Sequence, residues 1–396
     1  MWRFTRMNTR TRLQSAFLST LLLISTSAIS ADADDIQQQL DALKAENKLM
    51  MERLNASMDL IESTAGDTGD SSGYDHGSRG KTTVGGYGEL HYANLDSGKE
   101  VDLHRFILFL GHEFSDKIRF FSELEVEHAT VDGDGGEVAI EQAYIEFDIA
   151  QSTAIRAGVL LVPMGIINET HEPPTFYGVE RNNVEKFIIP STWREGGVSI
   201  SGQFAQAFSY DIALHSGLQT SLGDNYAVRK GRQSAREAPA EDLALTARVK
   251  WTGVAGLEIG GGIQQQTDIT QSTDATAGSA TLLETHAIWQ VQKFEVRALY
   301  ASWNLDGAGP QSIGADEQSG WYIEPAYKLN EKWGVYARQS SWDNQVNSNT
   351  DTESTQTDFG LSYWPHEDVV LKANYQILDT AGVNDDGLML GIGYQF

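Results

Sequence analysis

Hydrophobic and polar residues alternate with a period of two from about residue 81 to the end of the chain. The last segment is the clearest example, because Leu388, Leu390, Ile392, Tyr394 and Phe396 share one face and glycine, methionine or glutamine occupies the positions between them. A period of two indicates β-strands that have one apolar face. The pattern therefore predicts an all-β fold over this part of the chain.

The alternation divides 81–396 into sixteen strands, each near the roughly 9–11 residues that a tilted strand needs to cross a bilayer. Short turns and longer connections follow one another strictly, with long ones expected at 95–100, 162–192 and 218–240. Outer-membrane barrels have short periplasmic turns and long outer loops, whereas a soluble sandwich has no reason to sort its loops. We therefore expect a transmembrane antiparallel β-barrel of about sixteen strands.

The first 80 residues follow three other patterns. Four arginines and an apolar run within 1–30 indicate a secretory signal peptide. Residues 31–62 predict a short periplasmic α-helical coiled coil, or alternatively a single amphipathic helix that lies on another surface. Residues 63–80 predict a flexible linker. The seam of the predicted coiled coil is Ile36, Leu40, Leu43, Asn47, Met50 and Leu54.

Composition removes several classes of function. Lys+Arg 29 against Asp+Glu 55 gives a formal charge of −26, which argues against nucleic-acid binding. The chain has no cysteine, so disulfides and thiolate metal sites are excluded. His171-Glu172 lacks the second histidine of a zinc protease, and Pro173-Pro174 prevents a helix there. We find no pattern that predicts catalytic, cofactor-binding or metal-binding residues, and an enzyme is not expected.

A sixteen-stranded barrel encloses a water-filled channel, so the residues that face its lumen are the candidate selectivity residues. Rings of arginine select anions and rings of carboxylates select cations, whereas paired charges would only stiffen the wall. Both signs point inward if the apolar face contacts lipid. The pore-lining candidates are Arg105, Arg119, Arg156, Arg248, Lys250, Arg297, Arg338, Lys372, Glu123, Glu125, Glu127 and Glu146.

Two of the long connections are unusual. The segment 162–192 is too apolar for a solvated loop, and we interpret it as a loop that folds into the barrel and narrows the pore; the alternative is a packed cap at a trimer contact. The segment 218–240 carries a basic cluster, RKGR at 229–232 with Arg236, which would attract anions, bind lipopolysaccharide phosphates or simply be solvated. The constriction-loop candidates are Glu169, His171, Glu172, Glu180, Arg181, Glu185 and Lys186.

Three stretches of the barrel, VDLHRF at 101–106, EQAYIEF at 141–147 and RAG at 156–158, together with the terminal Phe396, resemble the phosphate-selective porin O/P family of Gram-negative outer membranes. The resemblance implies a trimeric channel with an inward-folded third loop and a ladder of arginines that guides phosphate. By their facing alone, the candidates for such a ladder are Arg105, Arg156, Arg248, Arg297 and Arg338.

These observations predict a homotrimeric porin in the cell outer membrane, passive and without cofactor, for small hydrophilic solutes or ions. Within that hypothesis we favour a preference for anions such as phosphate. The expected partners are outer-membrane lipid, lipopolysaccharide, further copies of the chain and small anionic solutes. The alternative function is structural, in which the barrel anchors a periplasmic coiled coil that ties the envelope together.

Overall fold

The computed structural model describes residues 81–129 and 136–396. The predicted signal peptide (1–30), coiled coil (31–62) and linker (63–80) lie outside these residues, and so do all six residues of the predicted seam.

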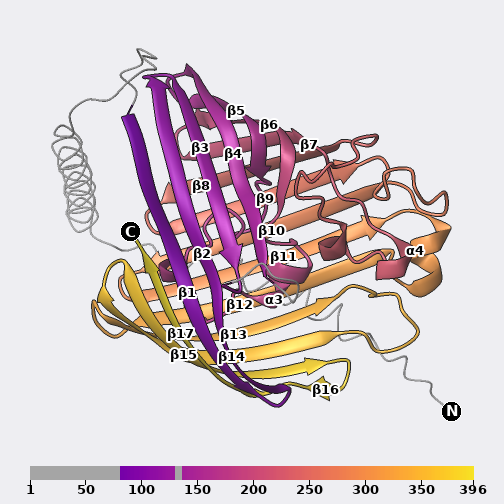
Figure 1. The fold of residues 1–396 in the computed structure, drawn as a ribbon. Helices are drawn as coiled ribbons and strands as arrows, with labels where there is room; N and C mark the ends of the chain where they lie inside the picture. The colour runs from indigo at the N-terminus through magenta and orange to yellow at the C-terminus, as the bar shows by residue number, and fades with distance from the viewer. Residues whose placement is uncertain (1–80, 130–135) are drawn as a thin grey trace. The chain divides into compact units, whose positions relative to one another are not determined.

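The described residues form a closed antiparallel β-barrel (Figure 1). Each long strand pairs with its neighbours in the sequence, and the ladder between the first and the last strand, from Tyr87↔Gln395 to Leu95↔Gly387, closes the ring. The long strands number sixteen within the described residues, since β16 is a two-residue extension paired with the end of β15. The strands are β1 (Lys81–Leu95), β2 (Gly98–Ser115), β3 (Ile118–Glu127), β4 (Glu137–Ala150), β5 (Thr153–Leu161), β6 (Arg194–Ala205), β7 (Phe208–His215), β8 (Ala244–Val254), β9 (Leu257–Gln266), β10 (Ala280–Val291), β11 (Phe294–Leu305), β12 (Glu317–Lys328), β13 (Trp333–Asp343), β14 (Ser354–His366), β15 (Val369–Thr380), β16 (Val383–Asn384) and β17 (Gly387–Gln395).

The two faces of the wall have inverted polarity compared with a soluble protein. In β15, Leu371 and Tyr375 are 42% and 40% exposed, whereas Lys372 and Asn374 are 5% and 4% exposed. Apolar side chains cover the outside of the barrel, and polar side chains fill the inside. Burial of ions and amides beneath an apolar exterior is stable only when lipid surrounds the barrel, as in outer-membrane proteins.

The connections leave the barrel at two ends, which we name by their loops. The short-turn end carries the connections after β2, β4, β6, β8, β10, β12 and β14, and the long-loop end carries 162–193, 216–243 and 267–279. The connection predicted as long at 95–100 is instead a turn of two residues, Asp96 and Ser97. That prediction was wrong because the β1–β2 ladder continues to the pair Leu95↔Gly98.

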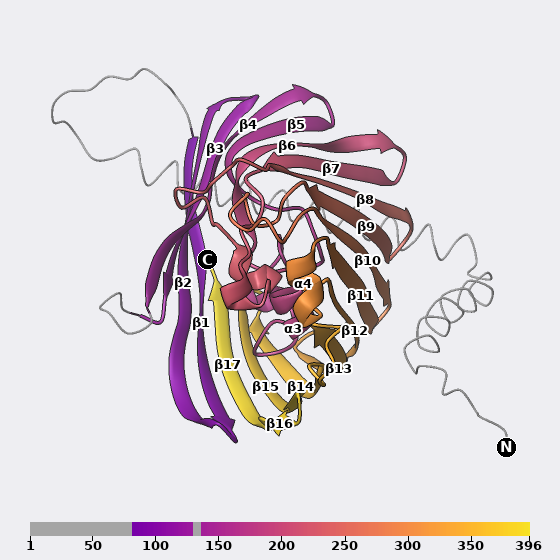
Figure 2. The ribbon, with the colours of Figure 1, turned by 90° about the vertical axis from the view of Figure 1, so that its right-hand side faces the viewer.

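Short helices occur only in the long-loop connections of the described residues, and no helix there is long and apolar enough to span a membrane. The segment 162–193 contains α3, and Figure 2 shows α3 inside the ring of strands. Its apolar residues, among them Met164, Val184 and Ile188, form a core with Trp303 and Trp342 of the wall. The helices are η1 (Pro173–Thr175), α3 (Asn183–Phe187), η2 (Leu222–Asp224), η3 (Val228–Gly231) and α4 (Ala308–Ile313).

Candidate functional site

Basic residues of the lumenal wall lie in ion pairs. Seven of the eight that the sequence places on the inward face contact a carboxylate of the same or a neighbouring strand, and their positive charges are therefore largely cancelled. Cross-strand pairing, one of the two interpretations of the alternating charges, describes these contacts except Arg297–Glu295, which lies within β11. The pairs are Arg105–Glu89, Arg119–Glu146, Arg156–Glu146, Arg248–Asp211, Lys250–Glu258, Arg297–Glu295 and Arg338–Glu324.

Lys372 is the exception among these eight residues. Its Nζ donates a hydrogen bond to the carbonyl oxygen of Gly178 at 2.7 Å and lies 3.6 Å from the centroid of the Phe176 ring. Both contacts are with the segment 162–193. Lys372 therefore holds this segment against β15 through a hydrogen bond and a cation–π contact.

The short-turn end opens into a vestibule of about 910 Å³. Glu146 lies in its wall between two arginines, with its Oε1 2.7 Å from Arg119 Nη2 and its Oε2 2.6 Å from Arg156 Nε. Arg119 also contacts Asp148 at 2.6 Å. Arg119 and Arg156 are each about one-third exposed. Arg119, Glu146 and Asp148 line the vestibule, so a solute that enters it meets these three side chains.

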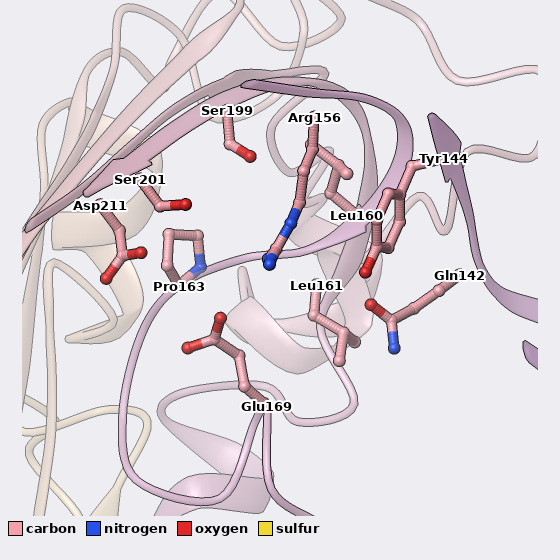
Figure 3. A pocket seen from close by; sticks show the side chains of 10 residues that line it. All are labelled: Gln142, Tyr144, Arg156, Leu160, Leu161, Pro163, Glu169, Ser199, Ser201 and Asp211. Atoms are coloured by element: carbon pink, nitrogen blue, oxygen red, sulfur yellow. The ribbon is translucent and has the colours of Figure 1, made fainter. Parts of the chain in front are cut away.

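A smaller cavity of about 20 Å³ lies between the vestibule wall and the segment 162–193. Figure 3 shows three side chains directed toward it: Arg156 from β5, Glu169 from the segment 162–193 and Asp211 from β7. The cavity has room for about one water molecule. Ser201 and Asp211 line both the cavity and the vestibule, whereas Arg156 lines the cavity.

The buried acid cluster of β3 and β4 contains residues that were not among the candidates. Glu141 is fully buried, with its Oε2 3.3 Å from His171 Nε2 and its Oε1 3.7 Å from Arg194 Nη1. Of the predicted carboxylates, Glu123 accepts a hydrogen bond from Gln142, and Glu125 lies 3.8 Å from Arg105. Glu127 is the last residue of β3, at the long-loop end, and its side chain is half-buried.

A β-bulge places Glu141 in the lumen. The register between β3 and β4 shifts between Glu123 and Leu124, so Glu141 and Gln142 both point inward. The bulge also reverses the phase of the apolar positions, since Ile140 and Phe147 are both exposed on the outer face although they are seven positions apart, an odd number that strict alternation would place on opposite faces. This change of phase is visible in the sequence and would have identified Glu141 as lumenal.

The segment 162–193 crosses the lumen and contacts the wall on several sides. Glu169 Oε2 lies 2.6 Å from Arg248 Nη1 on β8, His171 contacts β4, and Glu180 Oε1 lies 2.8 Å from His91 Nδ1 on β1. Glu172 precedes η1, and no side-chain hydrogen bond of it occurs among the described residues. A segment held from opposite sides of the ring lies across the pore.

Glu185 organises the turn of this segment at α3. Its carboxylate accepts hydrogen bonds from the backbone N–H groups of Ile166 and Ile167 at 2.9 and 2.6 Å, from Tyr322 at 2.8 Å and from Asn182 at 3.3 Å. Burial raises the pKa of Glu185 above its ordinary value, while these donors oppose the shift. The carboxylate thus joins the start of the segment, its helix and the wall strand β12.

Four cations of the long loops converge in what we call the basic loop cluster, which consists of Arg181, Lys186, Arg229 and Arg232. Arg229 donates to the carbonyl oxygens of Lys186 and Ser191, and Arg232 donates to the carbonyl oxygen of Thr192 at 2.9 Å. Arg181 donates to the Thr192 hydroxyl at 3.2 Å. Within residues 81–129 and 136–396, no carboxylate forms an ion pair with any of the four.

The cluster joins two segments that looked separate in the sequence. Arg181 and Lys186 were candidates of the constriction loop, and Arg229 and Arg232 belong to the basic stretch of 218–240. The interpretation of that stretch as a solvated loop suits Lys230 and Arg236, which are exposed, and does not suit Arg229 and Arg232, which are half-buried.

The positive charges of the cluster are poorly compensated. Burial, together with Arg232 and Arg181, lowers the pKa of Arg229 to about 9. Burial also lowers the pKa of Lys186, and Arg229 adds to this effect while Glu180 opposes it. The charged forms of both groups are therefore less stable here than in water. A nearby anion would remove part of that penalty.

Comparison with known proteins supports the β-barrel fold. An uncharacterized protein of Aquifex aeolicus (strain VF5) is 32% identical over 74% of this chain and 74% of its own length. The outer-membrane channel DcaP of Acinetobacter baumannii has a TM-score of 0.57 at 13% identity, over 82% of this chain and all of DcaP. The trimer form of OmpT, an outer-membrane protein of Vibrio cholerae, has a TM-score of 0.55 at 12% identity, over 80% and 99%. Identities this low support the fold alone.

The family model that matches is described as phosphate-selective porin O and P, and it covers residues 84–396. These residues include the long strands of the barrel except the first three residues of β1, together with the segment 162–193 and the basic loop cluster. The chain therefore belongs to the phosphate-selective porin O and P family of outer-membrane porins.

Proposed function

We propose that this protein is a passive outer-membrane porin for small hydrophilic solutes that prefers anions, including phosphate. The observation that carries the preference is the contrast between the lumenal wall and the loops. The wall arginines are neutralised by carboxylates, whereas the basic loop cluster has no carboxylate partner among the described residues. A polar passage that carries uncompensated charges of one sign concentrates ions of the opposite sign.

In this proposal an anion enters at the long-loop end, meets the basic loop cluster and leaves through the vestibule. Support for the first step comes from the donors that converge on Ser191 and Thr192, because guanidinium groups bind oxyanions with several hydrogen bonds. Support for the last step comes from Arg119, which lines the vestibule, and from Arg156, which lines the small cavity; each is about one-third exposed. The segment 162–193 would narrow the passage between them.

The proposal also includes a homotrimer, with lipid and lipopolysaccharide around it and the short-turn end in the periplasm. The exposed apolar exterior and the trimer form of the similarly folded OmpT support this arrangement. Short turns on one end and long loops on the other are typical of the periplasmic and outer sides of such barrels.

The proposed function is tested by the reversal potential of the refolded chain in a planar bilayer under a KCl gradient, with phosphate then added. We expect ohmic current steps, a reversal potential of the sign set by chloride, and partial block by phosphate. Cation selectivity without phosphate block would contradict the anion preference but would still be consistent with a porin. Absence of conductance would contradict the porin and favour the alternative function, an envelope anchor.

Glu146→Gln is expected to raise the preference for anions by about two- to threefold, because the substitution removes the carboxylate shared by Arg119 and Arg156 while Asp148 still neutralises Arg119. The permeability ratio of chloride to potassium measures the effect. The matched control is Glu331→Gln, an exposed glutamate of a turn at the same end. An equal change in both variants would mean that total charge matters and the position of Glu146 does not.

A further inference from the structure

Three histidines lie side by side on the lumenal side of the long-loop end. The rings of His91 and His104 are stacked, with centroids 4.7 Å apart and an angle of 16°, and the His128 ring meets the His104 ring edge-on at 5.8 Å. Asp102 lies between two of them, with its Oδ2 3.2 Å from His104 Nδ1 and its Oδ1 2.9 Å from His128 Nδ1. The proposed function uses none of these residues.

A second β-bulge brings His104 into this group. In the β1–β2 ladder, Glu89 pairs with Arg105 and His91 pairs with Asp102, so that two residues of β2 face the single residue Leu90. The bulge lets both His104 and Arg105 point into the lumen, whereas strict alternation would send one of them into the lipid. Bulges that redirect a side chain are frequent beside functional sites.

The chemistry of the group suits a transition-metal ion. One imidazole nitrogen from each of His104 and His128 and one oxygen of Asp102 lie within 4.8 Å of one another. Tetrahedral ligands on Zn²⁺ at bonds of ~2.0–2.1 Å are roughly 3.3 Å apart, close to the spacings of Asp102 to the two rings. Two imidazoles and one carboxylate favour Zn²⁺, Ni²⁺, Cu²⁺ or Fe²⁺ over Mg²⁺ or Ca²⁺.

We propose that Asp102, His104 and His128 bind a divalent transition-metal ion, such as Zn²⁺, at the long-loop end of the lumen. His91 is a positioning residue, because its ring stacks on that of His104 and is itself held by Glu89 and Glu180 at 3.2 and 2.8 Å. The site has three protein ligands and leaves further coordination positions to water or a passing solute.

Accessibility separates this group from the buried cluster of Glu123, Glu141 and His171. The side chains of His104, Asp102 and His128 are 20%, 21% and 43% exposed, so an ion can reach them from the water outside the barrel. His171 and Glu141 are almost fully buried, and Arg194 already neutralises that cluster. An added cation there would meet a positive charge.

The test is calorimetric titration of ZnCl₂ into the metal-free refolded chain in detergent. We expect one Zn²⁺ per chain, and an affinity that falls at least about tenfold in His104→Ala and in His128→Asn. His91→Ala should weaken binding less than either. His128→Asn should fold normally, because residue 128 lies beyond the end of β3 at a φ of 54°, which asparagine adopts readily. Circular dichroism checks that each variant is folded.

His366→Ala is the matched control, since His366 lies with Glu367 and Asp368 at the short-turn end and forms another group of possible ligands. Loss of Zn²⁺ binding in that variant alone would overturn the proposal. Unchanged affinity in His104→Ala and His128→Asn, or Zn²⁺ binding no tighter than that of Mg²⁺, would also overturn it. Binding is measured without current, so the result is independent of the proposed anion preference.

Discussion

In a chain that carries Arg229→Gln and Arg232→Gln, the permeability ratio of anions to cations is expected to fall about tenfold or more. These residues supply two of the four cations of the basic loop cluster, and no described carboxylate forms an ion pair with them. A passage lined by one sign of charge raises the local concentration of the opposite ion by ~10- to 10³-fold. Removal of half of the cluster should remove most of that enrichment. The reversal potential under a KCl gradient measures the loss.

Two further variants separate the possible causes. Lys230→Gln with Arg236→Gln removes the same charge from the same loop at exposed positions, and should change selectivity little, because salt screens exposed charges. Arg229→Lys with Arg232→Lys keeps the charge but loses the hydrogen bonds to the carbonyl groups of 186–192, and should retain the preference. If the exposed pair has the larger effect, the basic loop cluster is not the selective element.

Glu185→Ala is expected to release the segment 162–193 and to increase its opening equilibrium by about 100-fold. The substitution leaves the N–H groups of Ile166 and Ile167 and the Tyr322 hydroxyl without their acceptor. Each buried group without a partner costs ~1–3 kcal/mol, and ~3 kcal/mol in total corresponds to about two powers of ten. Hydrogen exchange of the Ile166 and Ile167 amides measures the opening, and larger, noisier current steps should accompany it.

Glu172→Ala is the matched control for that experiment. Glu172 belongs to the same segment, is half-buried and has no side-chain hydrogen bond among the described residues. Tyr322→Phe removes only one donor and should have a smaller effect than Glu185→Ala. Exchange as slow as in the unsubstituted chain in all three variants would mean that the segment is held by its apolar core with Trp303 and Trp342, and that the Glu185 carboxylate is dispensable.

The period-two pattern was sufficient to predict the barrel and the number of its long strands. The alternation in β15 specifies Leu371 and Tyr375 outside and Lys372 and Asn374 inside, and the structure has this arrangement. Strand facing is a local property, because successive side chains of an extended chain point to opposite sides. The error at 95–100 arose because its polar residues resemble a loop, although they continue the β1–β2 ladder.

The two bulges show the limit of strict alternation. At each bulge the apolar positions change phase, in β2 between Val101 and Leu108 and in β4 between Ile140 and Phe147, all four of which are exposed on the outer face. A reader of the sequence who allowed for one extra residue could have placed His104 and Glu141 in the lumen. The residues that face them, such as His171, come from the distant segment 162–193 and carry no such signal.

The sequence therefore specified the barrel, its inward charges and an unusual apolar segment, since each depends on neighbouring residues of one strand or one loop. Only the folded chain decided which charges form ion pairs among the described residues. The wall arginines find carboxylates on adjacent strands, whereas Arg181, Lys186, Arg229 and Arg232 meet one another on two loops that are separate in the sequence. Ion pairing depends on distances of a few ångströms between remote residues, and these distances are set by register and loop packing, which no local pattern encodes.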